Sequence, residues 1–151
     1  MKIQFEEFDI AMEVPKNGQL TMRDNVKADA VLPPLLFIYK TPNYSLSVTA
    51  APKKDNMTAE DMLEFNLEVL MKMDKDVPII KFIICKKEHV EYDVIMLLNQ
   101  DYILQTYYFF EEKIFCFTAN MKVKEELTQE NYTDYISYKE VANIIKSIVK
   151  I

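Results

Sequence analysis

Glycine is nearly absent from this chain: Gly18 is the single glycine among 151 residues. Phosphate-cradling loops and dinucleotide-binding turns need several glycines close together, because backbone amides must approach the phosphate closely. The strained turn that presents a nucleophilic serine in many hydrolases needs a glycine on either side of that serine. The composition therefore excludes nucleotide binding by those loops and hydrolysis by that turn.

Histidine and cysteine are also scarce, with one histidine, His89, and two cysteines, Cys85 and Cys116. A disulfide framework or a zinc knuckle needs more cysteines at closer spacing. Because free cysteine is among the most buried residue types, we expect both thiols to pack as small apolar groups. This use of cysteine suits a reducing compartment.

Two carboxylate patterns leave alternatives to be weighed. If a strand begins at His89, alternation places His89, Glu91 and Asp93 on one face, which is a possible set of metal ligands. A single histidine in a charged segment is more often solvated, so we predict no metal site. Neighbouring Glu111 and Glu112 would point to opposite faces of a strand, and a solvated turn explains them better. We predict no catalytic residue and no cofactor, and hence a protein that is not an enzyme.

Charge and hydropathy exclude two further classes of partner. The net charge is -6, and like-charged runs are no longer than pairs, so no basic stripe is present to follow a phosphate backbone. The first residues lack the apolar stretch of a signal peptide, and no apolar run reaches the roughly 18 residues of a membrane span. We expect a cytoplasmic protein that binds no nucleic acid and has no membrane span.

Apolar periodicity predicts an α+β fold in the order four strands, helix, four strands, helix. The predicted strands cover residues 8–14, 19–23, 35–41, 44–51, 79–87, 90–98, 102–110 and 114–119. Short breaks between the last four predict a meander of antiparallel hairpins. We expect residues 1–151 to form one domain, with an antiparallel sheet of about seven or eight strands and two main amphipathic helices packed on it.

Two capping boxes mark the expected starts of those helices. Thr58 and Asp61 have the required spacing, and the helix that follows is expected to run to about residue 75. Ser137 and Glu140 have the same spacing ahead of a second helix, which is expected to run to residue 150. The apolar stripe of this second helix is expected to consist of Val141, Ile144, Ile145, Ile148 and Val149.

A candidate interaction surface is predicted on strands 90–98 and 102–110. The second of these strands carries large aromatic rings on both faces. Its second face is therefore either a core face under a helix or an apolar surface for a partner or a second copy of the chain. The residues predicted for this surface are Ile95, Leu97, Ile103, Tyr107 and Phe109.

Three stretches of the chain resemble the PsbP-like family, whose relatives include Mog-like proteins, DcrB-type proteins and Eag chaperones of type VI secretion. They are Tyr102-Ile-Leu-Gln-Thr-Tyr-Tyr-Phe-Phe, Lys113-Ile-Phe-Cys-Phe-Thr-Ala and Glu140-Val-Ala-Asn-Ile-Ile-Lys-Ser-Ile. Members of that family similarly end in a strand hairpin ahead of a final amphipathic helix. The resemblance implies a PsbP/Mog-like layered sandwich that serves as an adaptor or chaperone, and it supplies no catalytic residues.

We therefore expect a non-enzymatic protein-binding module: an adaptor, a secretion chaperone or an immunity-type protein. A homodimer is compatible with this expectation. The alternative is a carrier of a small molecule or a lipid, which would use a cavity between sheet and helix. Such a cavity would be lined by Met62, Met73, Tyr108 and similar residues.

Overall fold

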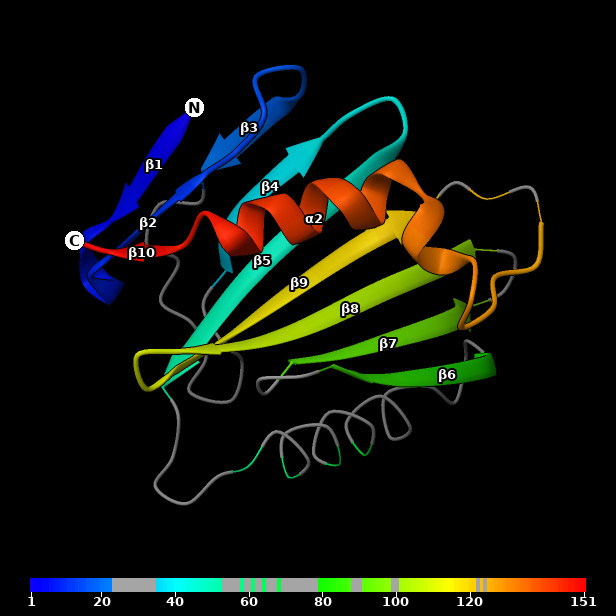
Figure 1. Cartoon of the computed structure of the whole chain (residues 1–151). Helices are drawn as coiled ribbons and strands as arrows, with labels where there is room; N and C mark the ends of the chain where they lie inside the picture. Colours follow the sequence, from blue (N-terminus) through cyan, green and yellow to red (C-terminus); the bar gives the residue numbers. More distant parts are fainter. Residues whose placement is uncertain are drawn as a thin grey trace.

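The structure, a computed structural model, describes residues 1–22, 35–52, 58, 61, 64, 68, 79–87, 91–98, 101–121, 123 and 125–151. In this part of the chain, ten strands form two antiparallel sheets, and helix α2 crosses one face of the larger sheet (Figure 1). Both ends of the chain belong to the smaller sheet and lie on the same side of the molecule (Figure 1). The expected α+β class with antiparallel sheets is confirmed.

The larger sheet has seven strands in the order β3-β4-β5-β9-β8-β7-β6. They are β3 (Gln19–Met22), β4 (Leu35–Lys40), β5 (Tyr44–Pro52), β6 (Ile79–Lys87), β7 (Glu91–Leu98), β8 (Asp101–Phe110) and β9 (Lys113–Met121). The predicted meander is confirmed, because β6, β7, β8 and β9 are neighbours in chain order. Strand β5 pairs with β9 along its whole length and joins the meander to β4 and β3.

The smaller sheet consists of β1 (Lys2–Phe5), β2 (Ile10–Glu13) and β10 (Val149–Lys150), in the order β1-β2-β10. The prediction of one continuous strand over residues 8–14 is wrong. A 3-10 helix over Glu6–Phe8 and a left-handed Asp9, with φ 52°, turn the chain so that only Ile10–Glu13 is extended. Strand β1 was not predicted, and it pairs with β2 away from the larger sheet.

Helix α2 spans Ile136–Lys146 and buries Val141, Ile144 and Ile145. The predicted capping box is wrong: Tyr135 is the N-cap residue, no side chain caps the helix, and the Ser137 side chain is buried. The predicted end at residue 150 is also wrong. The helix ends before Ser147, whose backbone N–H donates to the carbonyls of Asn143 and Ile144, both at 3.1 Å. The chain then enters β10, where Val149 is 47% exposed.

The capping box predicted at Thr58 is confirmed. The Asp61 N–H donates to Oγ1 of Thr58 at 3.1 Å, and the Thr58 N–H donates to Oδ2 of Asp61 at 3.0 Å. Hydrogen bonds from the Thr58 backbone N–H and from its side chain to the carboxylate lower the pKa of Asp61. Asp61, Glu64 and Glu68 are helical, and the two glutamates are exposed. The other residues of the predicted helix lie outside the described part of the chain.

The main core lies between α2, the small sheet and strands β4, β5 and β9 of the large sheet. The predicted alternation of β5 is confirmed, since Tyr44, Leu46, Val48 and Ala50 are all buried. They pack with Phe115 and Phe117 of β9 and with the apolar stripe of α2. No helix in the described part of the chain is long and apolar enough to cross a membrane.

Candidate interaction site

Strand register separates the five residues of the predicted interaction surface into two groups. Ile95 pairs with Leu104 and Met96 pairs with Ile103, so odd positions of β7 share a face with even positions of β8. Ile95 and Leu97 therefore lie on one face, and Ile103, Tyr107 and Phe109 lie on the other. The prediction that alternation brings all five together is wrong.

Two of these five side chains are buried within the chain. Ile95 is 1% exposed and packs with Leu104, Met121 and Leu127 on the face toward α2. Tyr107 is 3% exposed and belongs to a cluster on the opposite face with Tyr92, Val94 and Met96. Leu97, Ile103 and Phe109 are partly buried. Contact of this surface with a partner or a second copy stays a prediction.

Asp93, one of the residues weighed as metal ligands, is fully buried at the centre of a hydrogen-bond network. The Thr106 hydroxyl donates to Oδ1 of Asp93 at 2.6 Å, and the Tyr132 hydroxyl donates to Oδ2 at 2.7 Å. These bonds tie the segment before α2 to strands β7 and β8. The side chains of His89 and Glu91 lie outside the described residues. Among the residues that are described, no three His, Cys, Asp or Glu side chains gather to hold a metal ion.

Cys116 is a free, partly buried cysteine, as the sequence predicted, with its Sγ atom 3.6 Å from Oγ1 of Thr118. Burial raises the pKa of the Cys116 thiol to about 11. The thiol is thus protonated and a poor nucleophile at neutral pH. The side chain of Cys85 lies outside the described part of the chain.

A groove of about 280 Å³ opens where the small sheet meets α2. Its accessible lining comes from Met1, Glu13, Pro15, Glu140 and Asn143. Val14 and Ile144 also border the groove but are almost fully buried, so they offer little surface to a ligand. Polar and charged groups thus lie beside the apolar side chains of Met1 and Pro15, an arrangement typical of sites that recognise a side chain by both shape and charge.

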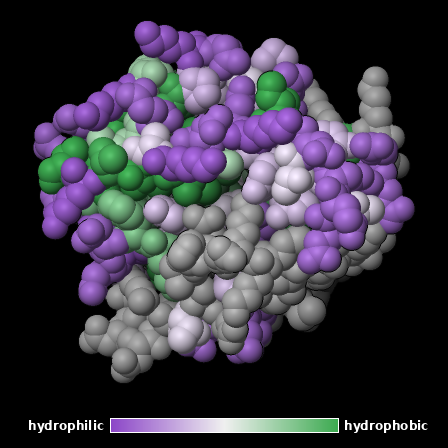
Figure 2. Space-filling view, viewed as in Figure 1, coloured by the Kyte–Doolittle hydropathy of each residue, from purple (hydrophilic) through white to green (hydrophobic). Residues whose placement is uncertain are grey.

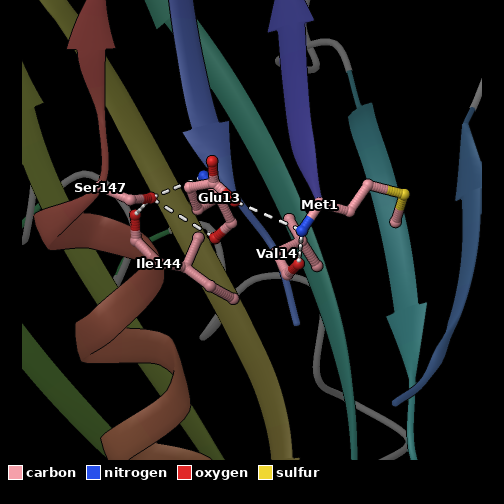
Figure 3. A network of polar contacts seen from close by, with 5 residues as sticks. All are labelled: Met1, Glu13, Val14, Ile144 and Ser147. Atoms are coloured by element: carbon pink, nitrogen blue, oxygen red, sulfur yellow. Dashed lines mark hydrogen bonds and ion pairs between the residues drawn. The ribbon is translucent and has the colours of Figure 1, made fainter. Parts of the chain in front are cut away.

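Hydrogen bonds hold the two walls of this groove together (Figure 3). The Met1 amine donates to the Val14 carbonyl at 2.8 Å and lies 3.3 Å from Oε2 of Glu13. At the end of α2, the Ser147 hydroxyl accepts from the Glu13 N–H at 2.7 Å and donates to the Ile144 carbonyl at 2.5 Å. The helix and β2 are therefore fixed relative to each other at the groove.

A tyrosine of the large sheet is hydrogen-bonded to the Glu140 carboxylate, and a second tyrosine lies against the first. The Tyr44 hydroxyl donates to Oε2 of Glu140, and the ring of Tyr44 lies 6.2 Å from the ring of Tyr39. The Tyr39 hydroxyl in turn donates to Oδ1 of Asn17 at 2.7 Å. Burial raises the pKa of Tyr44, with a further contribution from Glu140, so its hydroxyl stays protonated and continues to donate.

Exposed apolar side chains occur on the small sheet. Met1, which lines the groove, is 41% exposed. Val149 and Ile151, which pair with β2 toward its other end, are 47% and 49% exposed. Figure 2 shows apolar residues gathered on the side of the molecule where the small sheet lies, with hydrophilic residues around them. An apolar area with a polar rim is the composition expected of a protein-binding surface.

The groove was not predicted from the sequence. Glu13 lies within a predicted strand and Glu140 within a predicted capping box, and nothing in their local patterns connects them. One feature of the sequence pointed to a partner such as Glu140. Strand β5, with its alternating pattern, begins at Tyr44, and the hydroxyl of a buried tyrosine needs a polar partner. The identity of that partner depends on how α2 packs on the sheet.

Solved structures with the same arrangement of elements identify the fold. The chain is similar to cyanobacterial PsbP (CyanoP) from Synechocystis sp. PCC 6803, at 14% identity and a TM-score of 0.60, covering 100% of this chain and 92% of that chain. It is also similar to a variant of the protein Mog1, at 11% identity and a TM-score of 0.55, covering 100% and 95% of the two chains. No family model and no curated protein matches the sequence.

The architecture is therefore a PsbP/Mog-like fold, as the resemblance in the sequence implied. At these identities the comparisons define the fold alone, and function must be argued from the site.

Proposed function

We propose that this chain is a non-enzymatic protein-binding module, of the adaptor, chaperone or immunity type, that engages its partner at the groove between the small sheet and α2. The observation that carries the proposal is the groove itself, in which two carboxylates and an amide lie beside the apolar side chains of Met1 and Pro15. This combination provides both contact area and orientation for a protein partner.

The size of the groove favours side chains of a protein over a complete small molecule or lipid. Pockets for drug-sized ligands hold roughly 300–1,000 Å³ and enclose most of the ligand. The groove holds about 280 Å³ and is bordered by two carboxylates, which is an unfavourable setting for an acyl chain. Tyr108, named for the carrier alternative, packs on the main core and stacks on Phe110 instead.

The chemistry of the groove also favours binding over catalysis. Its described lining holds two carboxylates, one amide and the Met1 amine, which is bound to Glu13 and to the Val14 carbonyl, and no hydroxyl or thiol of that lining lies beside a base. Glu140 accepts a hydrogen bond from Tyr44, an arrangement that holds the carboxylate in place. We propose that the partner is a cytoplasmic protein.

Site-specific photo-crosslinking in the native cell tests this function. A photo-reactive phenylalanine analogue at Asn143, which is exposed and lines the groove, should capture a partner protein that mass spectrometry identifies. The same analogue at Glu130, an exposed residue outside the groove, is the matched control. The purified partner should then bind the unmodified chain and lose affinity for an Asn143→Arg variant, which fills the groove.

The alternatives give different results in the same experiment. A crosslink only to a second copy of the chain would indicate a homodimer. Equal capture from both positions would contradict a role for the groove. Recovery of a lipid or small molecule with no protein crosslink at either position would support the carrier.

A further inference from the structure

Glu140 lines the groove with a carboxylate that no described lysine or arginine neutralises. It is half-buried, and it accepts a hydrogen bond from the neutral hydroxyl of Tyr44. Within the described residues a single ion pair is found, between the Met1 amine and Glu13, so no described lysine or arginine neutralises Glu140. A partly buried charge without a counter-ion loses hydration and gains strongly from a cation that enters the site.

The carboxylate also has capacity for further hydrogen bonds. An ionised carboxylate offers about four acceptor positions, and the Tyr44 hydroxyl occupies one of them. That bond fixes the orientation of Glu140 before any ligand arrives. A group that donates two parallel hydrogen bonds would therefore meet a positioned acceptor, which lowers the entropic cost of binding.

The rest of the groove can pack against the stem of a long side chain. Met1, which is 41% exposed, and the partly buried Pro15 supply apolar surface in its lining, whereas Val14 and Ile144 are already buried within the chain. Asn143 adds an exposed amide, and the Glu13 carboxylate is paired with the Met1 amine. Arginine packs its methylene stem on apolar surface while its head group stays at a charged rim.

We propose that the groove binds an arginine side chain from an extended apolar segment of a partner protein, with the guanidinium paired to Glu140 and the stem on Met1 and Pro15. This inference rests on the proposed protein-binding function and names the chemistry that the partner brings. Arginine fits better than lysine, because its planar fork donates two parallel hydrogen bonds to one carboxylate. The net charge of -6 favours approach of such a basic segment.

Fluorescence anisotropy with two labelled peptides tests the proposal. The probe is a short peptide that alternates valine and arginine, and its match carries citrulline, which keeps the shape of arginine and removes the charge. The arginine peptide should bind the full chain, and the citrulline peptide should bind about tenfold or more weakly, as expected for loss of a charge pair. Chemical-shift changes in a titration should centre on Asn143 and Ile144.

Two variants separate the groove from general electrostatic attraction. Glu140→Gln keeps an acceptor for Tyr44 and should weaken binding of the arginine peptide by about tenfold. Glu7→Gln makes the same change of charge at an exposed site outside the groove and should alter binding by less than about twofold. Equal effects of the two variants, or equal binding of the two peptides, would overturn the proposal.

Failure of this inference can be distinguished from failure of the proposed function. If a protein is still crosslinked specifically at Asn143 while neither peptide binds there, the binding module stands and the arginine assignment is wrong. If both experiments give no groove-specific signal, both proposals are wrong.

Discussion

Gly18 lies directly against the ring of Tyr39. A Cβ atom at position 18 would come within 2.5 Å of the Cζ atom of Tyr39 and 2.6 Å of the Lys40 carbonyl oxygen. Tyr39 is fully buried, and its hydroxyl donates to Asn17 in the same turn, so the ring has little freedom to move away. The only glycine of the chain thus permits the close packing of the turn after β2 on the strand that supports the groove.

Replacing Gly18 with alanine should destabilise the protein. The added methyl group must displace the ring of Tyr39 or the backbone of Lys40, and overpacking of this kind costs about 1–3 kcal/mol. Lys16→Ala, at an exposed position of the same turn, is the control and should change stability by less than about 0.5 kcal/mol. Chemical denaturation measures both; equal midpoints for the two variants would contradict the close contact.

The hairpin turn between β8 and β9 should accept a stabilising replacement. Glu111 and Glu112 both have left-handed backbone angles, with φ of 47° and 64°, as a two-residue turn of this hand requires. Such angles cost a residue with a side chain about 1–2 kcal/mol, whereas asparagine and glycine adopt them readily. The double change Glu111→Asn with Glu112→Gly should raise the thermal midpoint. An unchanged or lower midpoint would show that the turn is unstrained.

Removal of residues 137–151 should unfold the chain. Val141, Ile144, Ile145 and Ile148 are each 6% exposed or less. Burial of one such side chain contributes about 1.5–3 kcal/mol, and a whole domain is stable by only about 5–15 kcal/mol. Removal of residues 149–151 alone, which include the exposed Val149 and Ile151, should leave a cooperative transition. Circular dichroism on heating distinguishes the two truncated proteins. A cooperative transition in the protein that lacks residues 137–151 would refute the prediction.

Stability should fall at alkaline pH. The pKa of the Cys116 thiol is raised by burial from 9.0 to about 11, and burial likewise raises the pKa of Tyr44 and Tyr107. The unfolded chain therefore loses these protons first as pH rises. The stabilisation is complete below about pH 9 and is lost as pH rises toward 11.

The pH dependence of thiol labelling tests the raised pKa of Cys116 directly. In a Cys85→Ala background, the reaction of Cys116 with a small alkylating reagent should reach half its maximal rate near pH 11. Half-maximal labelling near pH 9 would mean that the thiol is solvated in the folded protein.

The predicted partner contact of Tyr107 and Phe109 needs two separate variants. Tyr107 is 3% exposed, so Tyr107→Ser should lower stability by about 3–5 kcal/mol, as other losses of a large core ring do. Phe109 is only partly buried, so Phe109→Ser is the more informative test of association. Sedimentation and thermal unfolding should be measured together. Weaker association at an unchanged thermal midpoint would support a contact surface on this face.

Local patterns predicted those elements whose folding depends on neighbours in sequence. The strict alternation from Tyr44 to Ala50 predicted both the strand and its buried face. The spacing of Thr58 and Asp61 predicted a reciprocal cap that the hydrogen bonds confirm. Val141, Ile144 and Ile145 lie on one side of α2 because helical periodicity places them there whatever the helix contacts.

Register is the first feature that local patterns could not supply. Alternation assigns Ile95 and Tyr107 to a face of their own strands but does not say which faces coincide. Leu98 pairs with Asp101, so positions of opposite parity meet in β7 and β8. A register shifted by one residue would have brought Ile95 and Tyr107 to the same face.

The sequence by itself determined the class of fold, the faces of its strands and the apolar side of its last helix, because each follows from the periodicity of a short segment. Tertiary structure alone decided that both ends of the chain form a separate small sheet, and that Glu13 and Glu140 border one groove. The physical reason is that pairing over such sequence distances is fixed by the packing of whole elements, and hydrophobic burial is not directional.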